Sequence, residues 1–179
     1  MKLYEGSYRM NSPYGQRIMK NGDTRPHTGI DYVGISSKNI IAPTKGKIIT
    51  SQIITDRSNR TWEWGNYVKM DDLYGYYLFF CHLSKRLVKA GEIVEKGQII
   101  GVEGQTGYAL GRHLHFEVRR ISSNGTINPE DYFKILENRE RNIYKEMTQS
   151  RFGFDNNTMN YLSNHPYSHA LFEKLATRE

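Results

Sequence analysis

The stretch GRHLHFEV (residues 111–118) places two histidines, His113 and His115, two positions apart in a run that is typical of a β-strand. Side chains alternate between the two faces of a strand, so both imidazoles point to one face and Leu114 points to the other. Leu114 and the apolar residues that follow it at alternate positions are suited to a core. The face that carries two polar rings is therefore expected to hold a functional site.

Similar short strands precede this stretch. Residues 1–133 contain runs of β-branched and aromatic residues between turns that include glycine: GKIITSQIIT (46–55), GNYVKM (65–70), YGYYLFF (74–80) and QIIGVEG (98–104). Strands this short and closely spaced predict a mainly β fold built from antiparallel sheets.

The character of the sequence changes after Phe133. Residues 134–150 contain no Gly or Pro, and Glu137 stands four positions before Arg141, as in an amphipathic helix. We expect a β domain at residues 1–133 and a helical appendage at residues 134–179, which packs on the sheet or binds wall polymer or a partner.

Composition excludes several classes of protein. The 179 residues suffice for one sizeable domain, and the hydrophobic runs are too short for membrane insertion. A net charge of +6 suits a polyanionic partner, but the absence of an arginine-rich run or helix-turn-helix pattern argues against nucleic acid. The single cysteine, Cys81, excludes an internal disulfide and a thiolate-rich zinc site, and is expected to be a small buried residue. The sequence leaves the oligomeric state open.

Two further clusters contain histidine. HTGID (27–31) places His27 and Asp31 four positions apart, which puts both on one face of an extended chain. FCHLS (80–84) ends an aromatic strand with His82. Taken singly, each cluster is weak evidence, but their joint occurrence in one β-rich chain favours a site.

These clusters contain the kinds of ligand that a catalytic zinc needs. His27, Asp31 and one histidine of the pair 113/115 give three N and O ligands, which leaves a fourth position open for water. The other two histidines then act beside the metal, on the water proton or on the developing oxyanion. The residues alone leave open which histidine of the pair binds the ion.

Residues 12–133 resemble the lysostaphin-type (LytM-like) zinc endopeptidases, which cleave peptidoglycan peptides. The motifs that carry the resemblance follow one another in this order: SPYGQR (12–17), HTGID (27–31), IIAPTKGKII (40–49), GNYVKM (65–70), CHLS (81–84), VKAGEIVEKGQIIGVEGQTG (88–107), GRHLHFEV (111–118) and NPEDYF (128–133). The resemblance implies the antiparallel β-sheet groove of this family, a duplicated hybrid motif.

The resemblance also implies that His27, Asp31 and His115 bind one Zn²⁺ per chain, and that His82 and His113 are the catalytic histidines. Zinc lowers the pKa of its bound water to roughly 7, which supplies a hydroxide for attack on a peptide carbonyl. His113 is expected to be the base, because it shares a strand face with His115. His82 would then bind the oxyanion or protonate the leaving amine, and the two roles are interchangeable.

The loop TDRSNRTWEW (55–64) is rich in arginine and tryptophan. If it borders the groove, Arg57, Arg60, Trp62 and Trp64 bind glycan or stem peptide. The alternative is an ordinary surface loop.

The expected function is hydrolysis of cross-links or stem peptides of bacterial peptidoglycan, the predicted partner. One alternative is a non-catalytic module of the same fold that binds cell wall or activates another hydrolase, and a second is a phage tail structural component. The first residues, MKLYEGSYRM, lack the apolar stretch of a secretory signal. Together with a catalytic domain at the N-terminus and a C-terminal appendage, this resembles bacteriolytic phage endolysins, which move from the host cytoplasm to the wall, or virion-associated wall hydrolases, and we expect one of these.

Overall fold

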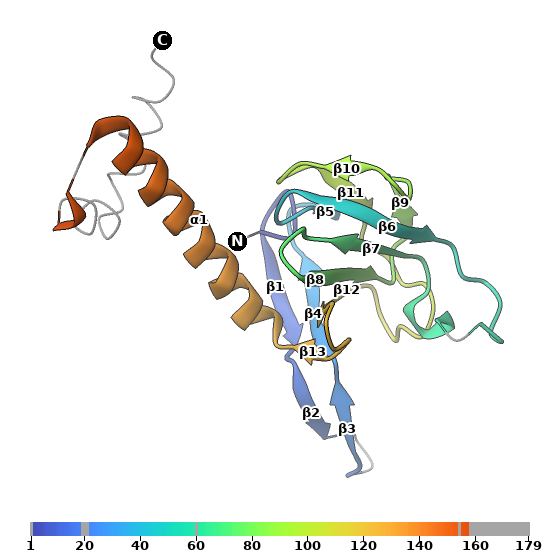
Figure 1. The fold of residues 1–179 in the computed structure, drawn as a ribbon. Helices are drawn as coiled ribbons and strands as arrows, with labels where there is room; N and C mark the ends of the chain where they lie inside the picture. The colour runs from blue at the N-terminus through green and yellow to red at the C-terminus, as the bar shows by residue number, and fades with distance from the viewer. Residues whose placement is uncertain (1, 19–21, 60, 154, 158–179) are drawn as a thin grey trace. The chain divides into compact units, whose positions relative to one another are not determined.

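The structure is a computed structural model that describes residues 2–18, 22–59, 61–153 and 155–157 (Figure 1). The chain divides into two compact units, Met1–Tyr132 and Phe133–Glu179. The helix expected after Phe133 is present as α1 (Pro129–Phe152), but it begins before that residue. Asn128 explains the earlier start, because its side-chain Oδ1 accepts a hydrogen bond from the backbone N–H of Glu130 at 3.0 Å, and Pro129 is suited to the first helical position.

Antiparallel sheets make up the β unit within the described residues (Figure 1). The main sheet has eight strands, in the order β1 (Tyr8–Ser12), β4 (Gly29–Gly34), β12 (Leu114–Arg120), β8 (Tyr76–Cys81), β7 (Tyr67–Asp71), β6 (Gly46–Gln52) and β10 (Ile93–Val94), with β13 (Thr126–Ile127) paired to β12. A second sheet joins β5 (Asn39–Ile41), β11 (Ile99–Val102) and β9 (Lys85–Arg86). The third is the hairpin of β2 (Gly15–Ile18) and β3 (Thr24–His27), which projects from the main sheet. The mainly antiparallel β fold predicted from the sequence is confirmed.

Side chains alternate between the two faces of the main sheet, so apolar core residues lie on one face and the residues of the candidate site lie on the other. One face carries large side chains that are fully buried in the core, among them Ile30, Phe80 and Phe116, which lie in register on β4, β8 and β12. The other face carries Asp31, Cys81 and His115 in register on the same three strands. Cys81 is fully buried, as predicted, and burial raises the pKa of its thiol.

A smaller apolar cluster lies on the second face. Its buried members are Ile54, Tyr67, Phe79 and Cys81. The 3₁₀ helix η1 (Trp62–Trp64) packs against them, and the Trp64 ring lies 5.0 Å from that of Phe79. The segment before β7 therefore covers part of the face that also bears Asp31 and His115.

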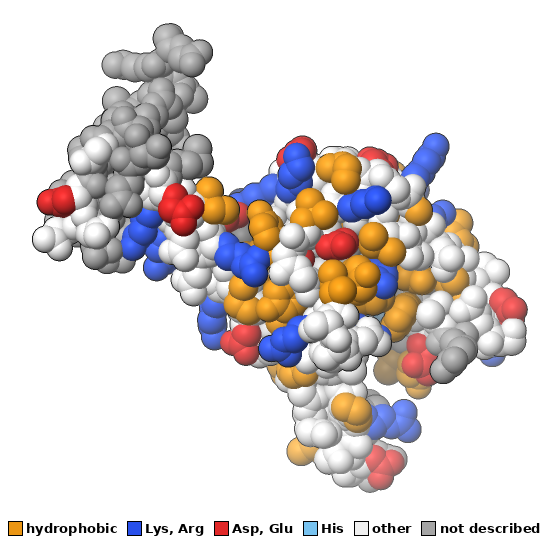
Figure 2. All heavy atoms as spheres, viewed as in Figure 1, with side chains coloured by type: hydrophobic (Ala, Val, Ile, Leu, Met, Phe, Trp, Pro, Cys, Tyr) orange, Lys and Arg blue, Asp and Glu red, His pale blue; other side chains and the backbone are white. Residues whose placement is uncertain are grey.

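The surface carries both charged and hydrophobic side chains. Figure 2 shows Lys and Arg side chains spread among hydrophobic ones over the face that it presents. None of the described helices is both long enough and apolar enough to span a bilayer.

Candidate metal centre

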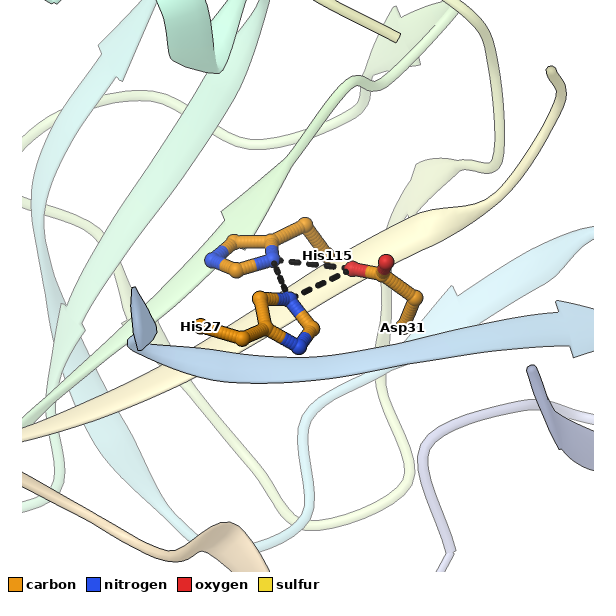
Figure 3. A group of neighbouring side chains, drawn as sticks. All are labelled: His27, Asp31 and His115. Carbon is orange, nitrogen blue, oxygen red and sulfur yellow. Dashed lines mark hydrogen bonds and ion pairs between the residues drawn. The ribbon is translucent and has the colours of Figure 1, made fainter. Parts of the chain in front are cut away.

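His27, Asp31 and His115 meet where the β2–β3 hairpin joins the main sheet (Figure 3). His27 ends β3, Asp31 lies in the middle of β4, and β12 places His115 directly opposite Asp31. Asp31 Oδ1 lies 3.1 Å from His27 Nε2 and 2.9 Å from His115 Nδ1, and the two nitrogens are 3.0 Å apart. The structure thus brings together the three residues that the sequence analysis assigned to metal binding.

The triangle of these three atoms fits a small divalent cation. A tetrahedral zinc with bonds of about 2.0–2.1 Å requires ligand atoms about 3.3 Å apart, close to the spacings seen here. Burial works to lower the pKa of His115, but hydrogen bonds and charge from Asp31 and Glu117 outweigh it and raise that pKa. The surroundings of this point therefore attract positive charge, as a metal centre requires.

The outer nitrogen of the His27 ring is held by the backbone. Its Nδ1 donates to the carbonyl oxygen of Pro13 at 2.6 Å, so in the neutral ring Nε2 presents its lone pair to the centre. Gly29 leaves room for the neighbouring ligand, because a Cβ there would lie 2.4 Å from the carbonyl oxygen of Phe116 and 2.8 Å from Cε1 of His115. The glycine of HTGID is thus required by close packing beneath the ligand.

The outer nitrogen of His115 faces a buried carboxylate instead. His115 Nε2 lies 3.5 Å from Glu117 Oε2, and Glu117 also accepts hydrogen bonds from the Thr28 hydroxyl and from Nε of Arg119. Burial works to raise the pKa of Glu117, but the hydrogen bonds from His115 and Thr28 and the charge of Arg119 outweigh it and lower that pKa. Glu117 therefore stays ionised beside the ligand.

Asp31 is held on both of its oxygens. Oδ1 faces the two imidazoles, and Oδ2 accepts a hydrogen bond from the Arg17 guanidinium at 2.7 Å. Burial works to raise the pKa of Asp31, but the hydrogen bonds from His115 and His27 outweigh it and the pKa is lowered strongly. Asp31 is accordingly a candidate ligand that carries a negative charge.

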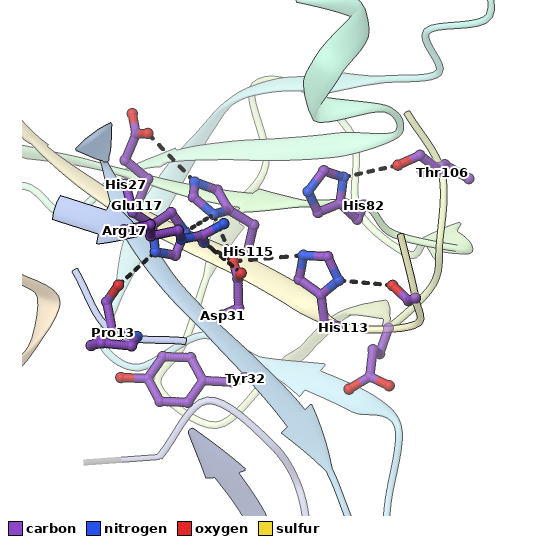
Figure 4. Close-up of polar contacts among 12 residues, drawn as sticks. Pro13, Arg17, His27, Asp31, Tyr32, His82, Thr106, His113, His115 and Glu117 are labelled. Carbon is purple, nitrogen blue, oxygen red and sulfur yellow. Dashed lines mark hydrogen bonds and ion pairs between the residues drawn. The ribbon is translucent and has the colours of Figure 1, made fainter. Parts of the chain in front are cut away.

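Two more histidines lie beside the triangle (Figure 4). The ring centroids of His82 and His113 are 4.7 Å apart, and His113 Nε2 lies 3.6 Å from Asp31 Oδ1. His82 donates through Nδ1 to the carbonyl oxygen of Thr106, and His113 donates through Nδ1 to that of Gly111, both at 2.8 Å. In their neutral forms both rings therefore present the lone pair of Nε2.

The environments of these two histidines differ. His82 is buried, and its backbone adopts a φ of 64°, a conformation that a non-glycine residue adopts rarely and that marks functional positions. Burial, followed by the charges of His113 and His115, lowers the pKa of His82 to about 3. His82 is consequently a neutral hydrogen-bond acceptor at physiological pH, whereas His113 is more open to solvent.

The loop predicted to bind substrate lies next to His82. The carbonyl oxygen of Trp64 accepts a hydrogen bond from the His82 backbone N–H at 2.8 Å, but the Trp64 ring itself packs in the apolar cluster. Arg57 lies over the Trp62 ring at 5.1 Å. Arg60 falls outside the described residues. Substrate binding by this loop stays a prediction.

Sequence reasoning missed several residues of the centre: Arg17, Thr28, Thr106, Glu117 and Arg119. Alternation from His115 would have placed Glu117 on the same face, as it did for His113. The contact of Arg17 with Asp31 depends on the path of the β2–β3 hairpin, and that of Thr106 depends on a backbone carbonyl. The pattern of side chains in the sequence therefore indicates neither the contact of Arg17 nor that of Thr106.

A buried carboxylate and two imidazoles around one point, with two further histidines at its edge, form a candidate mononuclear metal centre with the donor set that hydrolytic metal sites use. The family model described as "Peptidase family M23" matches residues 25–129. The chain belongs to this family, and its fold is that of the lysostaphin-type catalytic domains.

Individual relatives agree with this placement. The chain is 35% identical to the peptidoglycan DD-endopeptidase ShyC of Vibrio cholerae over 111 residues, 61% of this chain and 24% of that protein. The catalytic domain of the antimicrobial peptidase lysostaphin from Staphylococcus simulans shares 30% identity and a TM-score of 0.59 over 71% of this chain and 92% of that one. A zinc containing peptidase from Vibrio cholerae shares 29% identity and a TM-score of 0.60 over 70% of this chain and 37% of that one. The chain thus spans about a quarter of the length of its curated relative ShyC.

Proposed function

We propose that the protein is a zinc-dependent endopeptidase that hydrolyses peptide bonds of bacterial peptidoglycan. The observation that carries the proposal is the triangle of His27, Asp31 and His115, with His82 and His113 beside it, each held through Nδ1 by a backbone carbonyl. The relative ShyC is a peptidoglycan DD-endopeptidase, which supports the substrate class. The proposed place of action is the cell wall, reached from the cytoplasm of a phage host or carried on a virion.

The ligands and the metal would divide the work as follows. When bound, zinc supplies Lewis acidity and lowers the pKa of a water molecule to roughly 7. Asp31 contributes one negative charge and the two imidazoles contribute none, so the centre keeps a net positive charge that polarises a peptide carbonyl. One carboxylate ligand therefore preserves more Lewis acidity than two would.

His113 is the proposed proton acceptor. Its Nε2 lies 3.6 Å from Asp31 Oδ1, at the edge of the ligand triangle, and its Nδ1 is committed to the Gly111 carbonyl. A ring held in this way takes a proton on the side that faces the centre. His113 would thus accept the water proton and pass it to the leaving amine.

His82 has a different proposed role. To bind an oxyanion it would have to carry a proton on Nε2, but Nδ1 already donates to Thr106 and the lowered pKa keeps the ring neutral. We assign His82 the role of an acceptor that orients the attacking water or a substrate N–H. This departs from the oxyanion role that the sequence analysis considered.

Zinc content and digestion of peptidoglycan test the proposal. We expect about one zinc per chain in protein purified without chelators, release of soluble muropeptides from purified peptidoglycan, and loss of both zinc and activity in His115→Ala. Mass spectrometry of the muropeptides identifies the bond, either a glycyl bridge or a D-alanyl cross-link. Wild-type protein that binds peptidoglycan and zinc but releases no product would support the non-catalytic wall-binding module instead.

A further inference from the structure

Arg17 reaches the candidate metal centre from outside the motifs that supply its ligands. It lies on β2 of the hairpin whose other strand, β3, ends in His27. Gly15 pairs with His27 and Arg17 pairs with Arg25, so alternation places Arg17 on the same face of the hairpin as His27. This face directs the guanidinium of Arg17 to Asp31 Oδ2, at 2.7 Å (Figure 4).

The position of Arg17 is unfavourable for the stability of the hairpin. Arg25 stands directly opposite it, and like charges opposite one another on paired strands are destabilising. The Arg17 Nε is buried and has no hydrogen-bond partner among the described residues, which also costs free energy. The interaction that offsets both is the one with Asp31.

The two oxygens of Asp31 have different partners as a result. Oδ1 faces His27 Nε2, His115 Nδ1 and His113 Nε2, whereas Oδ2 is occupied by the guanidinium. A carboxylate can bind a metal through one oxygen or through both. With Oδ2 engaged in a charge-assisted hydrogen bond, Oδ1 is the oxygen left for the ion.

We infer that Arg17 is a positioning residue that holds Asp31 as a single-oxygen ligand and so keeps one coordination position of the metal open for water. The inference rests on the proposed metal centre. Without Arg17, Oδ2 would be free to turn towards a bound ion, which would raise its coordination number and reduce the Lewis acidity that it supplies. Arg17 would therefore act on the reaction through Asp31, without contact to the substrate.

Cobalt substitution tests the inference through coordination number, independently of activity. Four-coordinate Co²⁺ absorbs visible light more strongly than five- or six-coordinate Co²⁺. We expect Co²⁺-loaded wild-type protein to give an intense visible spectrum and Arg17→Met to lose a substantial part of that absorption at full loading. Arg17→Lys, which retains the positive charge but lacks the planar fork, should keep more of the absorption than Arg17→Met.

Arg25→Met is the matched control, because it removes the same charge from the facing position of the same hairpin. Its spectrum should equal that of the wild type. A wild-type spectrum in Arg17→Met would overturn the inference, and so would an equal loss in Arg25→Met, which would assign the effect to the charge of the hairpin. If wild-type protein bound neither cobalt nor zinc, the proposed metal centre itself would fail, and with it the inference. Thermal unfolding of the metal-free variants verifies that each one is folded.

Discussion

Replacement of Glu117 by glutamine should weaken zinc binding while leaving the fold intact. Glu117 is the buried partner of the outer nitrogen of His115, and it is itself held by Thr28 and Arg119. A hydrogen-bonded carboxylate fixes the tautomer of a ligating histidine and increases its basicity. Glutamine has the same shape but no charge, so the variant removes the electrostatic part of this interaction and little of the packing.

The expected size of the effect follows from the contact. Loss of such outer partners typically lowers metal affinity by about 10- to 100-fold. The separation of 3.5 Å between His115 Nε2 and Glu117 Oε2 is longer than an ordinary hydrogen bond, which indicates the lower end of that range. We therefore expect the zinc affinity to fall about tenfold, which corresponds to about 1.4 kcal/mol of binding free energy. Competition with a chromophoric chelator at fixed pH measures this change.

A second buried carboxylate provides the control for Glu117. Glu103 is also fully buried, accepts hydrogen bonds from the Tyr4 hydroxyl at 2.6 Å and the Gly34 N–H at 2.7 Å, and contacts none of the candidate ligands. Glu103→Gln should lower the free energy of unfolding but leave zinc affinity unchanged. Unchanged zinc affinity in Glu117→Gln, or an equal loss in Glu103→Gln, would refute the reasoning.

Three further outcomes are expected. Gly29→Ala should weaken zinc binding, because its Cβ would displace the His115 ring; a chelator titration with unchanged affinity would contradict the packing argument. In metal-free protein, the pKa of His82 of about 3 lies below its unfolded value of about 6.5, so the unfolded state binds the proton first and stability falls as pH drops between these values. His82→Gln should flatten this dependence by up to about 1.4 kcal/mol per pH unit, measured by denaturant unfolding. Residues 1–133 alone should cleave a soluble stem peptide; a folded but inactive fragment would assign residues 134–179 to the catalytic unit.

Much of the centre could be predicted from the sequence because its ligands obey simple periodicity. Alternation in GRHLHFEV predicts that His113 and His115 share one side, and both rings direct a nitrogen towards Asp31 Oδ1. The spacing in HTGID likewise predicts one face for His27 and Asp31, but residues four apart in a single extended strand would lie about 13 Å from each other. The chain is interrupted at Thr28 between β3 and β4, and this break brings His27 Nε2 to 3.1 Å from Asp31 Oδ1. Alternation within a strand therefore predicts that His113 and His115 share a face, whereas the approach of His27 to Asp31 depends on the break.

Relations between segments were harder to predict. The contact of Arg17 with Asp31 requires the hairpin of β2 and β3, the register of that hairpin and its junction with β4, none of which the composition of residues 12–31 specifies. Thr106 orients His82 through its backbone carbonyl oxygen, which every residue type has, so the sequence does not indicate this contact. The Trp64 ring packs against the apolar cluster, a contact that the polar sequence around it does not indicate.

One strand explains why stability and chemistry can be tested separately in this protein. In β12, Leu114, Phe116 and Val118 are fully buried in the core, while His115 and Glu117 alternate with them on the opposite face. The three apolar residues fix the position of the strand. His115 and Glu117 are placed by that strand and do not pack in the core. Enlarging or truncating the apolar residues should therefore change the free energy of unfolding first, whereas isosteric changes in the polar set should change metal affinity first. Leu114, Phe116 and Val118 thus fix the strand that carries His115 from the opposite face of the sheet, so the apolar half of the motif is needed for the candidate site as well as the histidines.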